Sequence, residues 1–312
     1  MTLVTIASGG EFEIVRKDDA PYRIVTGGPG LRGASAPGVA AGGSKGQALV
    51  KASGTDYDTA WVARREVLTA ARIYYVTTTG SDTNDGLTSG TAFATVQKAV
   101  DTVASLDTSI YQATINLGAG FFNETATLKR TVGALPSLIT GAGATSSSVA
   151  HITANNNFSK WRLTNMGLAG SDGGIGMQIT GNAAISIGGF DFGGTSRNQH
   201  VRAEEGALLE AEGNFSISAG TLQQAFDAIH ADIAFQGRTI TISANISVAQ
   251  FFSARAAGYV QVWFCTFSVG AFSVTGQRYV ANTNGILETG GAGATFIPGS
   301  AAGTTSTGGL YI

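Results

Sequence analysis

Short segments that alternate apolar and polar residues follow one another from about Gln112 to Ile312. Alternation with a period of two is typical of a β-strand with one buried face. Gly, Asn and Ser separate these segments, which recur about every ten residues or fewer. The expected strands are Ala113–Leu117, Leu138–Thr140, Ala150–Thr153, Trp161–Thr164, Met177–Thr180, Ala184–Ile187, His200–Ala203, Ala207–Ala211, Phe215–Ser218, Thr239–Ser243, Tyr259–Phe264 and Tyr279–Ala281.

The connections between these strands narrow the fold class. Most of them are too short to hold a crossover helix, which excludes a doubly wound α/β sheet. A sandwich, a barrel and a β-solenoid remain. The variable loop lengths, without a strict repeat motif, favour an irregular parallel β-helix with coils of about 20–25 residues. We therefore predict an all-β chain.

A helix is expected before the run of strands. Apolar residues recur at three- and four-residue steps over Phe93–Leu106, and Thr91 is the expected N-cap. We expect this helix to cover the open end of the first coil, an edge that would otherwise pair with other chains. Ile73–Thr77 reads as a strand, and Glu66–Ala71 as a short helix.

The first part of the chain differs from the rest in residue pattern and composition. Glu11–Val15 alternates like a strand, whereas Gly27–Gly43 is rich in Gly, Pro and Ala and has no apolar periodicity. That stretch reads either as a flexible linker or as a thin oligomeric stalk. We divide the chain into an attachment segment at 1–62, a neck with the helix at 63–111, and the β-helix body at 112–312.

Composition limits the partners. Charged residues make up 13% of the chain and the net charge is −2, which argues against a nucleic-acid partner. No stretch approaches the ~20 apolar residues of a membrane span, and the first residues do not resemble an export signal, so we expect synthesis in a host cytoplasm. Cys265 is the single cysteine and, beside Phe264 and Phe267, reads as a small buried apolar residue.

Three stretches carry a resemblance to a known family. Gly42–Val62 looks like a linker between an attachment stem and a fibre body. Ile73–Asp101, with its strand, its turn of Gly, Asp and Asn, and its capping helix, is similar to the opening of pectate-lyase-like β-helix domains. Gly276–Tyr311, with Pro298-Gly299, looks like a common ending of phage β-helix spikes.

Together these stretches resemble phage-type tail or head spike and fibre proteins with a pectate-lyase-like domain. The resemblance implies a right-handed parallel β-helix in a homotrimer on the surface of a virion or phage-like particle, such as a gene transfer agent. It implies that residues 1–62 bind a particle attachment protein and that the body meets a host polysaccharide. It implies no particular catalytic residues.

Spikes of this kind either bind surface glycans or cleave them, and cleavage by hydrolysis requires two carboxylates. Glu204, Glu210 and Glu212 share one parity in the densest acidic segment, opposite the apolar Leu209. In a single strand, Glu210 and Glu212 would point outward about 7 Å apart. They are the candidate catalytic pair. The alternative is that the strand face that carries them is exposed to solvent or lies in a contact between subunits of a trimer. A turn at Glu204–Gly206 would separate Glu204 from them.

Metal-binding and cofactor-binding patterns are weak. The turn Asp82–Gly86 lacks the acidic residue that completes an EF-hand, and Asp and Asn often build such turns by bonding to their own backbone. His151, His200 and His230 are scattered and do not show metal-ligand spacing. We expect neither a metal nor a cofactor.

Aromatic residues give candidates for glycan binding. Within Tyr259–Phe264, the residues Tyr259, Gln261 and Trp263 share the expected outer face, whereas Val260, Val262 and Phe264 share the expected core face. An exposed Trp beside polar groups can stack on a sugar ring. The alternative is that Trp263 is buried between subunits of a trimer.

Trp161 and Arg162 form a second aromatic and polar pair with the same two interpretations. The leading hypothesis is a spike or fibre subunit that binds capsular polysaccharide or lipopolysaccharide without cleaving it. A capsule depolymerase, acting as a hydrolase or a lyase, is the alternative. A purely structural decoration of a tail or capsid is the second alternative.

Overall fold

The computed structural model describes the backbone of residues 3–7, 11–15 and 22–25, and describes residues 41–133, 135–155, 158, 160–195 and 197–312 with their side chains. Contacts within the chain divide it into two compact units, Met1–Arg64 and Arg65–Ile312. Each unit is described by itself.

The first unit contains antiparallel strands. Strands β1, β2 and β3 form a meander, and β4 pairs with β5 in a hairpin. The expected strand at Glu11–Val15 is confirmed as β2, whereas residues 27–40 of the expected linker or stalk lie outside the described residues. The bounds are β1 (Leu3–Ala7), β2 (Glu11–Val15), β3 (Tyr22–Val25), β4 (Gln47–Lys51) and β5 (Thr59–Ala63).

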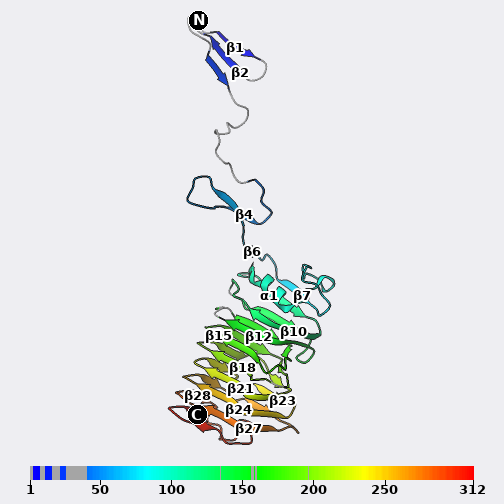
Figure 1. Cartoon of the computed structure of the whole chain (residues 1–312), viewed down its shortest axis with the longest axis vertical. Helices are drawn as coiled ribbons and strands as arrows, with labels where there is room; N and C mark the ends of the chain where they lie inside the picture. The colour runs from blue at the N-terminus through cyan, green and yellow to red at the C-terminus, as the bar shows by residue number, and fades with distance from the viewer. Residues whose placement is uncertain are drawn as a thin grey trace. The chain divides into compact units, whose positions relative to one another are not determined.

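The second unit is a parallel β-helix, which confirms the predicted fold (Figure 1). Its strands stack into two sheets in which each strand pairs in parallel with the strand one coil away. The first sheet contains β7 (Arg72–Val76), β9 (Ala113–Leu117), β11 (Ser137–Gly141), β13 (Lys160–Thr164), β16 (Ala184–Gly188), β19 (Leu208–Ala211), β22 (Asp232–Ala234), β25 (Tyr259–Gln261), β28 (Ile286–Glu288) and β30 (Leu310–Tyr311).

The second sheet continues around the corners of the coils. It contains β10 (Gly120–Leu128), β12 (Ser147–Asn155), β14 (Gly167–Leu168), β15 (Ile175–Thr180), β17 (Phe190–Phe192), β18 (Gln199–Glu204), β20 (Phe215–Ile217), β21 (Thr221–Ile229), β23 (Thr239–Ile242), β24 (Ile246–Arg255), β26 (Thr266–Ser268), β27 (Val274–Ala281) and β29 (Thr304–Thr305). A further short pair joins β6 (Glu66–Val67) to β8 (Leu106–Asp107).

Strand pairing fixes the length of each coil. Ile139 pairs with Ile115 on one side and with Leu163 on the other, and the intervals between these positions lie within the expected coil length. Val260 pairs with Ile233 and Leu287, and these intervals are slightly longer than expected. Part of the added length lies in the second sheet, where β24 has 10 residues and β15 has 6.

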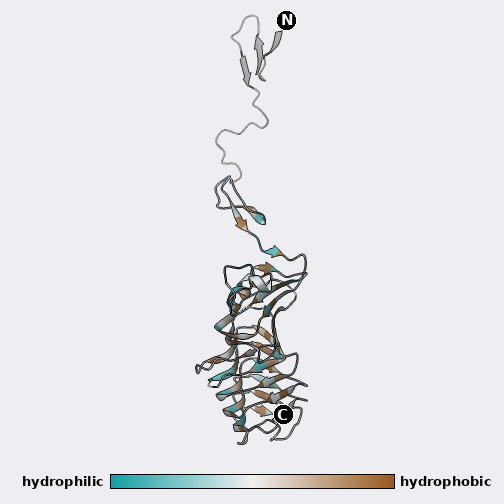
Figure 2. Ribbon diagram, turned by 90° about the vertical axis from the view of Figure 1, so that its right-hand side faces the viewer, coloured by the Kyte–Doolittle hydropathy of each residue, from teal (hydrophilic) through white to brown (hydrophobic). Residues whose placement is uncertain are grey.

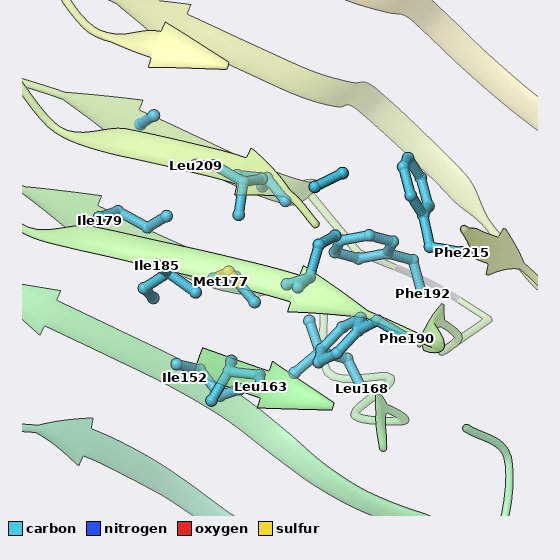
Figure 3. Close-up of a cluster of buried hydrophobic side chains, with 14 of the residues drawn as sticks. Ile152, Leu163, Leu168, Met177, Ile179, Ile185, Phe190, Phe192, Leu209 and Phe215 are labelled. Atoms are coloured by element: carbon cyan, nitrogen blue, oxygen red, sulfur yellow. The ribbon is translucent and has the colours of Figure 1, made fainter. Parts of the chain in front are cut away.

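Apolar side chains that are in register on successive coils fill the interior. One such column contains Ile152, Met177, Val201, Phe226, Phe252 and Tyr279, all buried. Figure 3 shows part of this core, where Phe190 lies beside Leu168 and Phe192. Figure 2 shows apolar segments on strands throughout the stack. Each fully buried large side chain contributes about 1.5–3 kcal/mol.

The helix α1 (Val96–Ala104) is shorter than the predicted Phe93–Leu106. Its N-cap is Thr95, whose side-chain oxygen accepts a hydrogen bond from the Lys98 N–H at 3.1 Å. Asp82 accepts hydrogen bonds from the Thr95 backbone N–H (3.0 Å) and hydroxyl (2.7 Å). Glu124 accepts from the Val96 N–H at 2.7 Å. These two carboxylates stabilise a start at residue 95.

The remaining predictions around the helix need correction. The expected N-cap, Thr91, instead ends the 3-10 turn η1 (Ser89–Thr91). Phe93 precedes the helix and stacks on Tyr74 at 6.0 Å between ring centroids. Glu66–Ala71 is not helical, because Glu66 and Val67 pair with β8 as β6.

The expected role of the helix is confirmed. Val96, Ala99, Val100 and Val103 belong to the same buried cluster as Ile115 of the first coils. Figure 1 shows α1 at one end of the stack, opposite the chain's C-terminus. Among the described residues, helices are too short to cross a membrane.

A buried histidine lies in the second sheet. His200 on β18 is fully buried beside Phe192, and its Nε2 donates to the Ala219 carbonyl oxygen at 3.0 Å. Burial, together with the nearby charge of Arg197, lowers the pKa of His200 to about 3. The folded chain therefore holds this imidazole neutral.

The pKa of His200 predicts a pH-dependent stability. Unfolded His titrates near 6.5, so between pH 6.5 and about 3 the unfolded chain binds one proton more than the folded chain. Stability should fall as the pH falls across this window, by roughly 2–3 kcal/mol at pH 4.5 from this group. Urea unfolding at pH 7 and pH 4.5 should show a smaller fall for His200→Gln than for the unaltered chain. Equal falls would contradict the assignment.

Candidate functional site

The outward side of the first sheet gathers most of the residues that the sequence singles out. Strand register aligns outward residues of successive coils into two columns. One column contains Arg162, Ser186, Glu210, Ala234, Gln261 and Glu288, and the other contains Lys160, Ala184, Leu208, Asp232, Tyr259 and Ile286. We call this surface, with the loop residue Glu212 that follows β19, the polar face.

An ion cluster occupies the β13–β19 part of the polar face. Lys160 Nζ lies 2.9 Å from Glu210 Oε2 and 3.0 Å from Glu212 Oε1, and Arg162 Nε lies 2.7 Å from Glu212 Oε2. The cations are on β13 and Glu210 is on β19, two coils or about 10 Å apart. They meet because the strand between them, β16, carries only Ala184 and Ser186 on this side.

The cluster sets the charge state of its carboxylates. Burial alone would raise the pKa of Glu212, but hydrogen bonding to Lys160 and the charges of Lys160 and Arg162 outweigh burial and lower it. A glycosidase acid requires a raised pKa to hold its proton. Glu212 is therefore arranged as an anion, in the manner of a general base, a nucleophile or a binding group.

The acidic segment itself folds as expected. Glu210 and Glu212 lie on the outer side and are half-buried, whereas Leu209 is fully buried. The turn at Glu205–Gly206 separates Glu204, which ends β18 in the second sheet and pairs with Arg202 at 2.7 Å.

A shallow hollow of about 390 Å³ adjoins the ion cluster, at the carboxyl ends of the strands. Its lining combines a charged pair, two short polar side chains and bare backbone. The lining residues are Leu138, Arg162, Thr164, Asn165, Gly188, Gly189, Glu212 and Gly213. Gly188, Gly189 and Gly213 contribute only backbone to this lining and have no side chain to fill the hollow.

A second hollow, of about 420 Å³, lies at the other end of β13. It combines the cations Arg130 and Lys160 with the exposed apolar side chains of Leu135 and Phe158. Lys160 therefore belongs both to this hollow and to the ion cluster. The polar face offers a continuous polar strip along β13.

A hydrogen-bonded group occupies the β22–β28 part of the polar face. The Tyr259 hydroxyl donates to Glu288, and the Gln236 amide donates to Gln261. The bond to Glu288, with partial burial, raises the pKa of Tyr259 to about 12, so this phenol stays protonated at neutral pH. Tyr259 and Gln261 face outward, as expected, and are half-buried.

The prediction that Trp161 presents its ring to a glycan is corrected. Lys160 and Arg162 point outward from β13, so Trp161 between them points inward. Its side chain is fully buried, and its indole nitrogen donates to the Lys129 carbonyl oxygen at 2.9 Å. Arg162 remains on the polar face.

The predicted strand Tyr259–Phe264 is also shorter than expected. Strand β25 ends at Gln261, and Trp263 and Phe264 form a turn. Val260 and Val262 are buried as expected, whereas Phe264 is 78% exposed and is not a core residue. Trp263 is half-buried.

The remaining polar motifs have structural partners. Asp82 accepts hydrogen bonds from Thr95, the N-cap of α1, and Asp85 accepts from the Leu87 N–H at 3.0 Å, as expected for a turn. His151 bonds to Asp172 at 2.8 Å. Among the residues that the structure describes, no three potential metal ligands lie together.

Several residues of the polar face escaped the sequence analysis. Lys160, Gln236 and Glu288 acquire their partners only through the stacking of coils. A signal for this existed in the sequence, because the interval from Arg162 to Glu210 is twice the length of one coil in this part of the stack.

Comparisons with models of protein families, with curated proteins and with solved structures find no match to this chain.

The ion cluster predicts a salt-dependent stability. Lys160→Met removes the cation that Glu210 and Glu212 share, whereas Lys160→Arg keeps the charge. We expect Lys160→Met to lower the free energy of unfolding by about 1 kcal/mol at low salt, because the carboxylates then repel each other with less compensation. The loss should shrink in 1 M NaCl, where charges are screened. Urea titrations at both salt concentrations measure it, and a loss independent of salt would argue against an electrostatic origin.

Proposed function

We propose that this chain is a spike or fibre subunit of a phage or phage-derived particle, and that its polar face binds a host surface glycan. The observation that carries the proposal is the hollow of about 390 Å³ beside the ion cluster. It is shallow, polar and open, as expected of a site for an extended chain of sugars.

The chemistry of the polar face suits hydroxyl-rich ligands. The ion pair between Arg162 and Glu212 fixes donors and acceptors in place before a ligand arrives, which reduces the entropy that binding must offset. Thr164 and Asn165 add short groups that both donate and accept. Arg130 in the second hollow favours an acidic substituent.

The particle context is supported by the family resemblance of three stretches in the sequence. In this proposal residues 1–62 bind the particle attachment protein, and the body binds capsular polysaccharide or lipopolysaccharide at the surface of the virion or phage-like particle. Glycan cleavage by Glu210 and Glu212, as in a capsule depolymerase, is the first alternative. A structural decoration without glycan binding is the second.

Glycan binding should depend on Arg162. We expect the full chain to bind a subset of capsular polysaccharides or lipopolysaccharides on a printed array, and Arg162→Ala to weaken that binding about tenfold through loss of charge-assisted hydrogen bonds. Arg202→Ala is the matched control, because Arg202 makes an ion pair of the same length, 2.7 Å, on the second sheet. If the chain binds nothing on the array, the alternative of a purely structural decoration is favoured. If the two variants weaken binding equally, the polar face is not the binding site.

The length of the same polysaccharides after incubation with the protein distinguishes binding from cleavage. Size-exclusion chromatography after incubation should show chains of unchanged length. Shortened chains would replace the proposal by the depolymerase. If the Glu212→Gln variant no longer shortens the polysaccharide while the Arg202→Ala variant still does, the cleavage is assigned to Glu210 and Glu212.

The proposed assembly predicts a mass. A homotrimer of this 31.7 kDa chain should sediment at about three times the monomer mass. Analytical ultracentrifugation of the full chain at micromolar concentration measures this. A monomer at all concentrations would contradict the trimeric part of the proposal.

A further inference from the structure

Phe264 has a backbone conformation that its side chain disfavours. Its φ is +58°, in the left-handed region that bulky residues rarely adopt. In the stacked turns, Phe264 aligns with Gly237 one coil before and with Gly291 one coil after, at the same interval that separates the paired residues of β22, β25 and β28. Both glycines also have positive φ, +68° and +79°. This turn position therefore has the positive φ that favours glycine. Of the three aligned coils, only this one has a residue with a side chain at the position.

The side chain of Phe264 gains little burial to offset this backbone strain. Phe264 is 78% exposed, so most of its ring remains in water. The left-handed conformation costs about 1–2 kcal/mol for a residue with a β-carbon. Strained residues that stay exposed often belong to binding sites, because the local cost is retained for function.

Trp263 and Phe264 form a pair with open surroundings. Their ring centroids are 5.0 Å apart and their planes meet at 69°. Gly237 and Gly291 have no side chain that could cover the phenyl ring, and Phe264 is 78% exposed. A β-carbon on Gly290 would lie 3.1 Å from the Trp263 β-carbon, so a larger residue there would crowd the base of the pair.

The pair lies at the edge of the polar face. It directly follows β25, whose Tyr259 and Gln261 hold the hydrogen-bonded group described above. An aromatic surface beside amide, phenol and carboxylate groups matches a pyranose ring, which presents C–H groups on one face and hydroxyls at its rim. Two rings with glycine turns on both sides form a contact far smaller than the roughly 800 Å² per partner of a stable protein interface.

We propose that Trp263 and Phe264 form a carbohydrate-stacking subsite for a pyranose unit, at the opposite end of the polar face from the Arg162 hollow. This inference rests on the proposed glycan binding. It assigns a binding role to Phe264, which the sequence places in the core. The subsite holds the sugar by its apolar face and does not require a charged substituent.

Phe264→Gly tests the subsite in the full chain. The probe is the polysaccharide that the unaltered chain binds most tightly on the array. We expect its affinity to fall about 5- to 10-fold, as for the loss of one aromatic contact. Because glycine relieves the left-handed strain, the Tm should stay unchanged or rise by up to about 3 °C. Phe264→Tyr should retain the affinity.

Ala257→Gly is the matched control. Ala257 is exposed with φ +60° in a turn on another corner, so its replacement relieves similar strain without removing an aromatic ring. It should leave the affinity unchanged. If Phe264→Gly binds the polysaccharide as tightly as the unaltered chain while Arg162→Ala still binds it more weakly, the subsite is overturned and the proposed glycan binding stands.

Three further outcomes also overturn the subsite. A fall in Tm for Phe264→Gly would show that the ring serves the fold. A change of its sedimentation would show a contact between subunits. If the unaltered chain binds no polysaccharide, the proposed function itself fails and the subsite fails with it.

Discussion

The parallel pairing of each coil with the next is the constraint on which the rest of the structure depends. Backbone hydrogen bonds to both neighbours hold the strands about 4.8 Å apart and in register. Every inward position must then fit a column, as in the alignment of Met177, Val201 and Phe226. The first coil lacks a neighbour on one side, and α1 covers its apolar interior. The same register places outward residues of distant sequence position side by side.

Strands are easiest to predict from the sequence where buried and exposed residues alternate, and harder where consecutive residues are all buried. Strand β9 was predicted to the residue, because its burial alternates. Strands β21 and β24 were not predicted. In β21, Ala225–Ala228 are all buried, because outward Asp227 lies under Arg255, with which it pairs. Alternation disappears when a tertiary ion pair covers the outer face. The start of α1 likewise depends on Glu124, a residue from a later strand.

Part of the candidate site was predictable as single residues, whereas Lys160, Gln236 and Glu288 and the arrangement of the site were not. Parity alone placed Glu210 and Glu212 outside, and Arg162 outside with them once β13 was recognised. The same parity, applied consistently to β13, would have placed Trp161 inside. The assignment of Phe264 to the core failed for another reason: β25 ends at Gln261, and alternation ceases to apply in the turn that follows. The equal spacing of Gly237, Phe264 and Gly291 along the chain was the available sign of a turn.

Small residues on intermediate coils decide which outward groups interact. Ala184 and Ser186 on β16 let Lys160 of β13 reach Glu210 two coils away. A long side chain at either position would separate them, because coils are only about 4.8 Å apart and each outward residue otherwise contacts its immediate neighbours. Gly237 and Gly291 act in the same way on either side of Phe264, because they have no side chain to cover its exposed ring. The chemistry of the outer surface thus depends as much on where the coils lack side chains as on where they carry charges or rings. A search for function in a parallel β-helix can begin from small residues that flank large or charged ones at the coil spacing.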